Sequence, residues 1–88
     1  MFSVEQVIYA ANELGVQFDK YSFNEFFDGM NIELEHGKQN SKTNVTDDDV
    51  LTTAKIALAH LNEFPNYYNL VYGLRTFENF LKQKLGSK

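Results

Sequence analysis

A long apolar segment in the middle of the chain constrains the fold more than any other feature. Residues 46–64 read TDDDVLTTAKIALAHLNEF. At about 100° per residue, the apolar side chains of this segment cover roughly 220° of a helix circumference, whereas a helix on a surface needs a stripe of only about 100°. They are Val50, Leu51, Ala54, Ile56, Ala57, Leu58, Leu61 and Phe64. We expect this helix at the centre of a small bundle, because it must be packed on several sides.

Three serine or threonine residues mark helix starts. Each is followed three residues later by Gln, Glu or Asp, which is the spacing of a capping box. The pairs are Ser3 with Gln6, Ser22 with Glu25, and Thr46 with Asp49. Gly15, Gly37 and Gly86 suit helix ends, and Pro65 interrupts the helical pattern. The sequence therefore predicts an all-α fold, a single compact bundle of four helices near residues 4–14, 23–35, 47–63 and 66–85.

Length and composition place the chain in one broad class. Its 88 residues form one domain with a small core. There is no cysteine, which fits a reducing cytoplasm, and the start of the chain lacks the regions of a signal peptide. No apolar run approaches the roughly 20 residues that span a bilayer. We expect a cytoplasmic protein without membrane contact, either a monomer or a small homo-oligomer.

The charge balance argues against nucleic acid as a direct partner. The net charge is −4, from eight basic and twelve acidic residues. Binding to a phosphate backbone needs clustered positive charge, and the basic residues are scattered until the last turn. An acidic chain of this kind is better suited to a protein partner.

The sequence contains none of the common catalytic motifs. G-x-S-x-G, H-E-x-x-H and cysteine are all absent. Residues 47–49 are three successive aspartates, but a calcium loop alternates its oxygen ligands and includes a glycine. At a helix start these acids instead stabilise the positive end of the helix dipole. The sequence favours a non-enzymatic protein without an organic cofactor.

Two Glu/His pairs form the only constellation that suggests a metal site. Glu33 and His36 lie three residues apart, as do His60 and Glu63, so each pair shares one helix face. Helical bundles hold divalent metals with carboxylate and imidazole ligands from such steps on facing helices. The structural alternative places His36 at a helix C-terminus and His60 at the core boundary, bonded to a neighbouring carbonyl or carboxylate.

Several aromatic residues near the C-terminus lie off the apolar stripe of the predicted fourth helix. Tyr68, Tyr72 and Phe80 are in this group, and Arg75 lies near the two tyrosines. Such residues either form a surface for a protein partner or cover the edges of neighbouring helices.

Three motifs in the middle of the chain occur in a fixed order. They are ELEHG at residues 33–37, TNVTDDD at residues 43–49 and KIALAHLNEFPNYY at residues 55–68. Together they resemble an uncharacterised family of small bacterial and bacteriophage proteins, a domain of unknown function, over about residues 29–68. The chain has Val50 and Asn66 where relatives often have proline and aspartate. The resemblance implies no particular activity.

The resemblance directs attention to the polar residues of the shared motifs. They are Glu33, Glu35, His36, Thr43, Asn44, Asp47, Asp48, Lys55, His60, Glu63 and Tyr67. Thr43 and Asn44 can fold the loop back through side-chain to backbone hydrogen bonds. The glutamates and histidines form either a buried polar network between the second and third helices or the lining of a ligand site.

These observations support three functional hypotheses. The favoured one is a small cytoplasmic accessory or protein-interaction domain, of phage or mobile-element origin by resemblance. The alternative is a metal-binding or metal-dependent catalytic bundle, whose divalent metal would be held by Glu33, His36, His60 and Glu63. The third is an acidic inhibitor of a nucleic-acid-binding protein, which requires one continuous negative face from Glu25, Asp28, Glu35 and residues 47–49.

Overall fold

The protein is all-α with four α-helices in the computed structural model, which describes residues 1–69 and 73–86. The helices are α1 (Val4–Leu14), α2 (Phe23–Ile32), α3 (Val50–Glu63) and α4 (Leu74–Gly86), and a 3-10 helix, η1 (Glu33–His36), continues α2. No strand occurs in the described residues. The predicted all-α class and the number of helices are confirmed.

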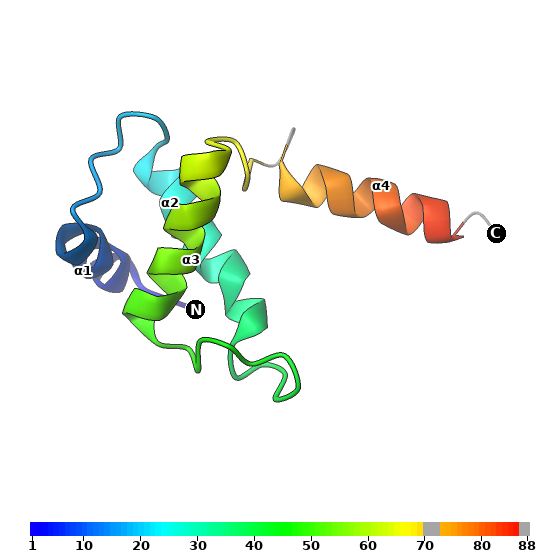
Figure 1. Ribbon diagram of the computed structural model, residues 1–88, viewed down its shortest axis with the longest axis horizontal. Coiled ribbons are helices and arrows are strands. Elements are labelled where there is room, and N and C mark those ends of the chain that lie inside the picture. Colours follow the sequence, from blue (N-terminus) through cyan, green and yellow to red (C-terminus); the bar gives the residue numbers. More distant parts are fainter. Residues whose placement is uncertain (70–72, 87–88) are drawn as a thin grey trace.

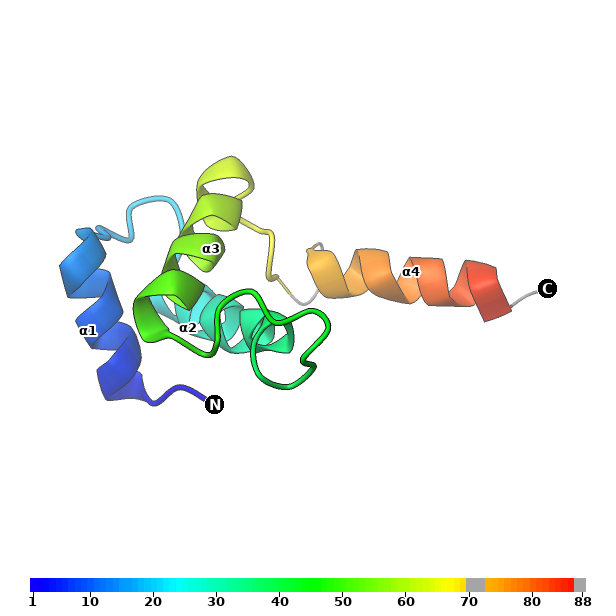
Figure 2. The ribbon, with the colours of Figure 1, turned by 60° about the horizontal axis from the view of Figure 1, so that its bottom comes forward.

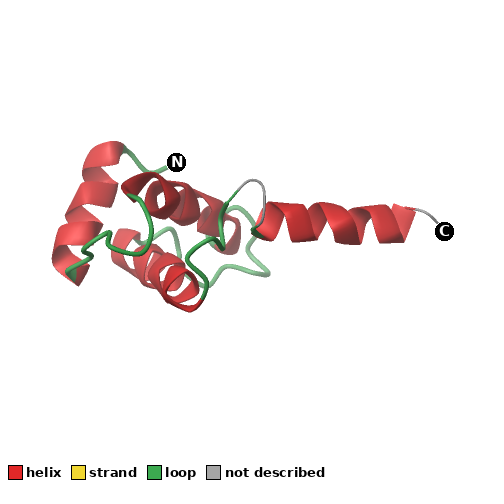
Figure 3. Ribbon diagram, turned by 90° about the horizontal axis from the view of Figure 1, so that it is seen from above, coloured by secondary structure: helices red, strands yellow, loops and turns green. Residues whose placement is uncertain are grey.

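Helix α3 is central, as its broad apolar surface predicts. It packs against α1, α2 and η1 (Figures 1 and 3). Ala54 and Ala57 are fully buried on α3, and these small side chains allow the neighbouring helices to approach closely. The largest fully buried side chains around them are Phe26, Met30, Leu61, Val7 and Thr53. We call residues 1–69, which include this core, the helical body.

The first two helices begin where their local signals predict. Ser3 and Gln6 form a capping box, in which the Ser3 hydroxyl accepts from the Gln6 amide at 3.2 Å. Ser22 and Glu25 form a second one, with the corresponding distance 3.1 Å. Helix α1 ends at Gly15, whose φ of 66° lies in the left-handed region that favours glycine.

Helix α2 differs from the predicted 23–35 helix at its C-terminal end. The α-helix ends at Ile32, and the next four residues form η1. Gly37 follows η1 as its C-cap, but its φ of −107° lies outside the left-handed region of the common glycine cap. Its lack of a side chain matters for packing instead, because a Cβ atom there would collide with the carboxylate of Asp48.

The N-cap predicted at Thr46 is wrong, and α3 begins at Val50 rather than near residue 47. Asp49 is the N-cap, and its carboxylate accepts from the Thr52 amide at 2.9 Å. Thr46 is buried, and its hydroxyl accepts from the Asp48 amide at 3.2 Å. Asp47 and Asp48 have positive φ values of 54° and 59°, so these aspartates form a turn before the helix.

Helix α4 begins eight residues later than predicted and extends away from the helical body (Figures 1 and 2). Pro65, Asn66 and the two tyrosines that follow form turns, in which the Asn69 amide donates to the Asn66 carbonyl at 2.9 Å. The Leu74 amide donates to the Tyr67 carbonyl at 2.6 Å, which fixes the start of α4 beside this turn. Residues 70–72, which the predicted helix included, lie outside the described residues.

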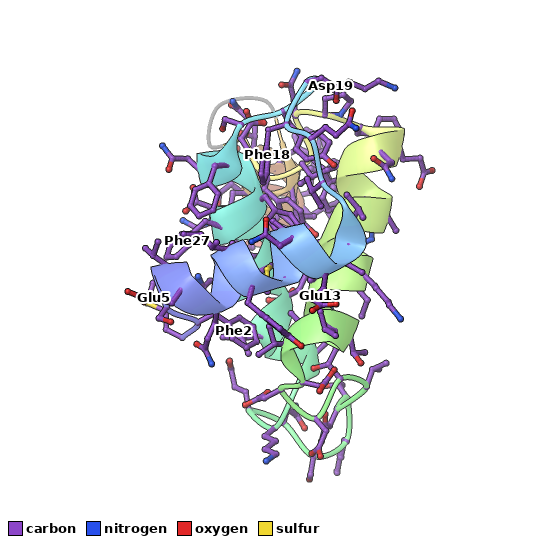
Figure 4. The ribbon with its side chains drawn as sticks, turned by 90° about the vertical axis from the view of Figure 1, so that its left-hand side faces the viewer. Phe2, Glu5, Glu13, Phe18, Asp19 and Phe27 are labelled. Atoms are coloured by element: carbon purple, nitrogen blue, oxygen red, sulfur yellow. The ribbon has the colours of Figure 1, made fainter. Side chains whose placement is uncertain are left out.

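The side of the molecule away from α4 carries exposed acidic side chains. Glu5 and Glu13 lie on α1 and Asp19 lies on the loop that joins α1 to α2, whereas Phe18 of the same loop packs against the core (Figure 4). Phe18 packs edge-on against Phe26, with 5.8 Å between the ring centroids. None of the helices in the described part of the chain is both long enough and apolar enough to span a membrane.

We predict that acid removes part of the stability that Asp49 supplies. Hydrogen bonds from the Thr52 backbone and side chain hold the pKa of Asp49 below its ordinary value of 3.8. A lowered pKa in the folded state stabilises the protein above the unfolded-state pKa, and this stabilisation is lost as the pH falls through the lowered value. Asp49→Asn keeps an oxygen acceptor for the cap but cannot titrate.

Urea unfolding of both proteins between neutral pH and about pH 2 tests this prediction. The difference in free energy of unfolding, wild type minus Asp49→Asn, is expected to be constant above about pH 5 and to decline below about pH 4. A difference that does not change with pH would show that the charge on Asp49 does not stabilise α3.

Candidate functional site

A buried carboxylate, that of Glu33, lies where α2 passes into η1. Glu33 is only 2% exposed, which is unusual for a glutamate. The 3-10 geometry of η1 places side chains three residues apart above one another, so Glu33 and His36 share one side. Of the first predicted Glu/His pair, Glu33 contacts His60 of α3, whereas the His36 side chain is 49% exposed.

The Glu33 carboxylate is shared by two other side chains. The Tyr68 hydroxyl donates to Glu33 Oε2 at 2.5 Å, and His60 Nδ1 lies 3.0 Å from the same oxygen. His60 Nδ1 also lies 2.9 Å from the Tyr68 hydroxyl oxygen. We call this arrangement the Glu33–His60–Tyr68 cluster. It joins η1, α3 and the turn that follows α3.

The geometry assigns the protons of the cluster. Because a carboxylate oxygen only accepts, both Tyr68 O–H and His60 Nδ1–H act as donors towards Glu33. The His60 side chain is 34% exposed. Burial and the hydrogen bond to Glu33 raise the pKa of Tyr68 far above its ordinary value of 10.0, so its hydroxyl remains protonated.

Aromatic packing fixes the position of the imidazole. Tyr67 stacks on His60, with 4.3 Å between ring centroids and 19° between planes. Tyr67 and Tyr68 meet edge to face at 4.9 Å. Gly29 of α2 makes room for Tyr68, because a Cβ atom at Gly29 would lie 2.5 Å from the Tyr68 ring. The cluster is therefore held by α2 as well.

Three of the four predicted metal ligands meet in the structure, and the fourth does not. Glu33 Oε1 is buried without a hydrogen bond, and His36 Nε2 lies 3.8 Å from it. His60 contacts the other carboxylate oxygen. Glu63 is exposed on α3. Among the described residues, no three His, Cys, Asp or Glu side chains are arranged to hold an ion. The metal hypothesis stays a prediction.

The other motif residues lie on the loop between η1 and α3 or on the surface. The Asp47 amide donates to Asn44 Oδ1 at 2.7 Å, and the Lys38 amide donates to Asp48 Oδ1 at 2.9 Å. The Thr43 hydroxyl contacts the Asn40 carbonyl at 3.4 Å. These bonds close the loop on itself, whereas Glu35 and Lys55 are exposed and outside the cluster.

The predicted partner surface is wrong for Tyr68. Its side chain is 2% exposed and belongs to the cluster. Tyr72 lies outside the described residues, and Arg75 and Phe80 are exposed on α4. Arg75 and Tyr68 both line a second groove, of about 450 Å³. Sequence reasoning missed the pairing of Tyr68 with Glu33, although the two adjacent tyrosines after Pro65 were a visible signal.

An open, mainly apolar groove lies between the turn after α3 and the start of α4. It has a volume of about 730 Å³ and is lined by Phe64, Pro65, Asn66, Tyr67, Gly73, Leu74 and Phe77. We call it the apolar groove. Burial raises the pKa of Tyr67, and so do nearby carboxylates, those of Glu33, Glu78, Glu35 and Glu63 in decreasing order. Carboxylates therefore lie near the groove on the side of Tyr67, although no acidic side chain lines it.

The substitution Tyr68→Phe is expected to destabilise the protein by about 1–3 kcal/mol, because it leaves the buried Glu33 oxygen with one donor fewer. The matched control is Tyr9→Phe. Tyr9 is 51% exposed on α1, and its change is expected to stay within about 0.5 kcal/mol. Urea unfolding measures both values, and equal losses would contradict a structural role for the cluster.

The metal hypothesis predicts a joint response of the two histidines. Chelator-stripped protein is titrated with zinc, manganese or iron(II) while imidazole NMR signals are recorded. A site at Glu33 requires His36 and His60 to shift together at micromolar metal, and Glu33→Gln to abolish the response. Scattered shifts at millimolar metal would eliminate the hypothesis.

Comparison with known proteins identifies the family of this chain without assigning a function. No curated protein and no solved structure matches it. The model of the family described as "Protein of unknown function (DUF5661)" matches residues 7–76, well over half of the 88 residues. This match includes the whole cluster, the loop before α3 and all but one of the residues that line the apolar groove. The chain therefore belongs to the DUF5661 family of proteins of unknown function.

Proposed function

We propose that this protein is a non-enzymatic interaction domain that binds an amphipathic helix with basic side chains in the apolar groove. The observation that carries the proposal is the apolar groove itself, which is open to solvent and has carboxylates near its residue Tyr67. A cytoplasmic location and a bacterial or phage origin are part of the same proposal.

The shape of the groove suits a helix with bulky apolar side chains. Phe64 is 59% exposed and Phe77 is 58% exposed, so two large aromatic residues on its walls are available for contact. Peptide-binding proteins commonly receive the apolar face of a helix in such a groove. Exposed aromatic residues of this size are also the usual anchors of protein interfaces.

The charge around the groove selects for a basic partner. Glu63 on α3, Glu35 on η1 and Glu78 on α4 lie close enough to Tyr67 to raise its pKa. Residues 1–69 contain four lysines and eleven acidic residues, a net charge of −7. Lysine or arginine side chains flanking an apolar helix face would meet this negative field, which favours both association rate and choice of partner.

The cluster supports this function by holding the groove in place. Tyr67 lines the groove and stacks on His60, and Tyr68 anchors the same turn to Glu33. A preorganised groove loses less conformational entropy on binding than a flexible one. The acidic-inhibitor hypothesis also requires a basic partner, but it needs one continuous negative face that includes Glu25. Glu25 is partly buried in its capping box and contributes little to such a face.

A titration with a defined peptide tests the proposal. The probe is a synthetic helix of about 15 residues with Leu and Phe on one face and Lys on the other. In ¹⁵N NMR spectra we expect shifts concentrated at the residues that line the groove. A peptide with Glu in place of Lys is expected to bind more weakly.

Charge-neutral variants locate the binding surface. Glu63→Gln is expected to weaken binding of the Lys-rich probe by about two- to fivefold, which is the contribution of one exposed ion pair. The matched control is Glu13→Gln, because Glu13 lies on α1, on the side of the helical body away from α4 (Figures 1 and 4). Equal binding of both peptides, or equal effects of both variants, would contradict the proposed function.

A further inference from the structure

The apolar face of α4 is uncovered along most of its length. Phe77, Phe80, Leu81 and Leu85 are 58%, 52%, 43% and 66% exposed. With Leu74, these side chains follow the spacing of one helix face. At about 100° per residue, Glu78 and Lys82 border this face on one side. Lys84 lies between the positions of Phe77 and Phe80, and its Nζ is 5.7 Å from the Phe80 ring centroid.

The helical body of the same chain does not cover this face. Leu74, at the start of α4, packs against the core, but the rest of the helix extends away from it (Figures 1 and 2). Helix α4 packs against no other helix in residues 1–69. Its second half therefore lies outside its own apolar groove.

The net charge of the chain changes sign between the helical body and the segment that contains α4. Residues 1–69 have a net charge of −7, whereas residues 70–88 contain three lysines, one arginine and one glutamate, a net charge of +3. Helix α4 thus has the chemistry that the apolar groove requires, an apolar face with basic side chains beside it.

We propose that two copies of this chain associate through α4, antiparallel, so that the second half of each α4 lies on the apolar groove of the other copy. This inference rests on the proposed function and identifies the partner as a second copy. A two-fold axis makes the contact isologous and closed, so both grooves are filled and no further copies add.

The dimensions of α4 fit this arrangement. Thirteen residues give a helix of about 20 Å. The apolar residues are centred near Asn79 and Phe80, so an antiparallel pair with its two-fold axis there aligns the two apolar faces. Leu85 of one copy then lies beside Leu74 of the other, at the groove. Glu78 of each copy lies opposite Lys82 of the other.

The buried area sets the expected strength. Phe64 and the four exposed apolar residues of α4 are each about half exposed, and at roughly 100 Å² each the two copies would bury about 1,000 Å² of apolar surface. This value is near the lower end for specific interfaces. We therefore expect a concentration-dependent dimer that dissociates at roughly micromolar concentrations.

Sedimentation equilibrium of the full chain tests the inference. We expect a monomer–dimer equilibrium, which Leu81→Asp shifts at least tenfold towards monomer. Asn79→Asp adds the same charge on the opposite face of α4 and should leave the equilibrium within about twofold, since it touches no partner. Circular dichroism of both variants confirms that the helices remain. A monomeric wild type, or equal effects of the two variants, would overturn the inference.

A charge exchange tests the antiparallel register. Glu78→Lys and Lys82→Glu should each weaken self-association. In a dimer of either variant, residues 78 and 82 of facing copies carry the same charge, and the two-fold axis repeats this repulsion. An equimolar mixture of the two variants should restore a dimer that contains one copy of each. If the mixture associates no better than the separate variants, the proposed register is wrong.

The peptide titration separates this inference from the proposed function. It is repeated with the Leu81→Asp variant, whose groove is not occupied by a second copy. If wild type is monomeric and the Lys-rich probe still binds the groove, only the second copy is excluded as the partner. If wild type is monomeric and the probe does not bind, both proposals fail.

Discussion

Glu33 places a carboxylate inside the core of a small protein, where an unpaired charge would cost several kcal/mol. The buried Glu33 carboxylate is stabilised by two donors that come from elsewhere in the chain, the imidazole of His60 and the hydroxyl of Tyr68. These donors reach the same oxygen only when η1, α3 and the turn after α3 are all in place. The cluster thus couples segments that apolar packing alone would hold less specifically.

The contact with Glu33 is made from the turn that follows Pro65. Tyr68 lies in this turn and reaches Glu33 across 35 positions of sequence. Helix α4 begins only after this turn, at Leu74. The same turn contributes Tyr68 to the cluster and Pro65, Asn66 and Tyr67 to the lining of the apolar groove.

Local signals predicted the parts of the fold that depend on neighbouring residues. The capping boxes at Ser3 and Ser22 and the glycine at position 15 depend on contacts within a few residues, and these features occur as predicted. The start of α3 was missed because Gly37 packs against Asp48, a contact that no local pattern encodes. For the candidate site, spacing and resemblance identified Glu33 and His60. The position of Tyr68 depends on tertiary structure, so its role was not predictable from periodicity.

Tyr67 belongs to two structures at once, because one face of its ring stacks on His60 while the residue lines the apolar groove. Any molecule that fills the groove and displaces this ring alters the surroundings of the imidazole. The hydrogen-bonded interior and the proposed binding surface therefore share one aromatic ring, and a displacement of Tyr67 would reach both.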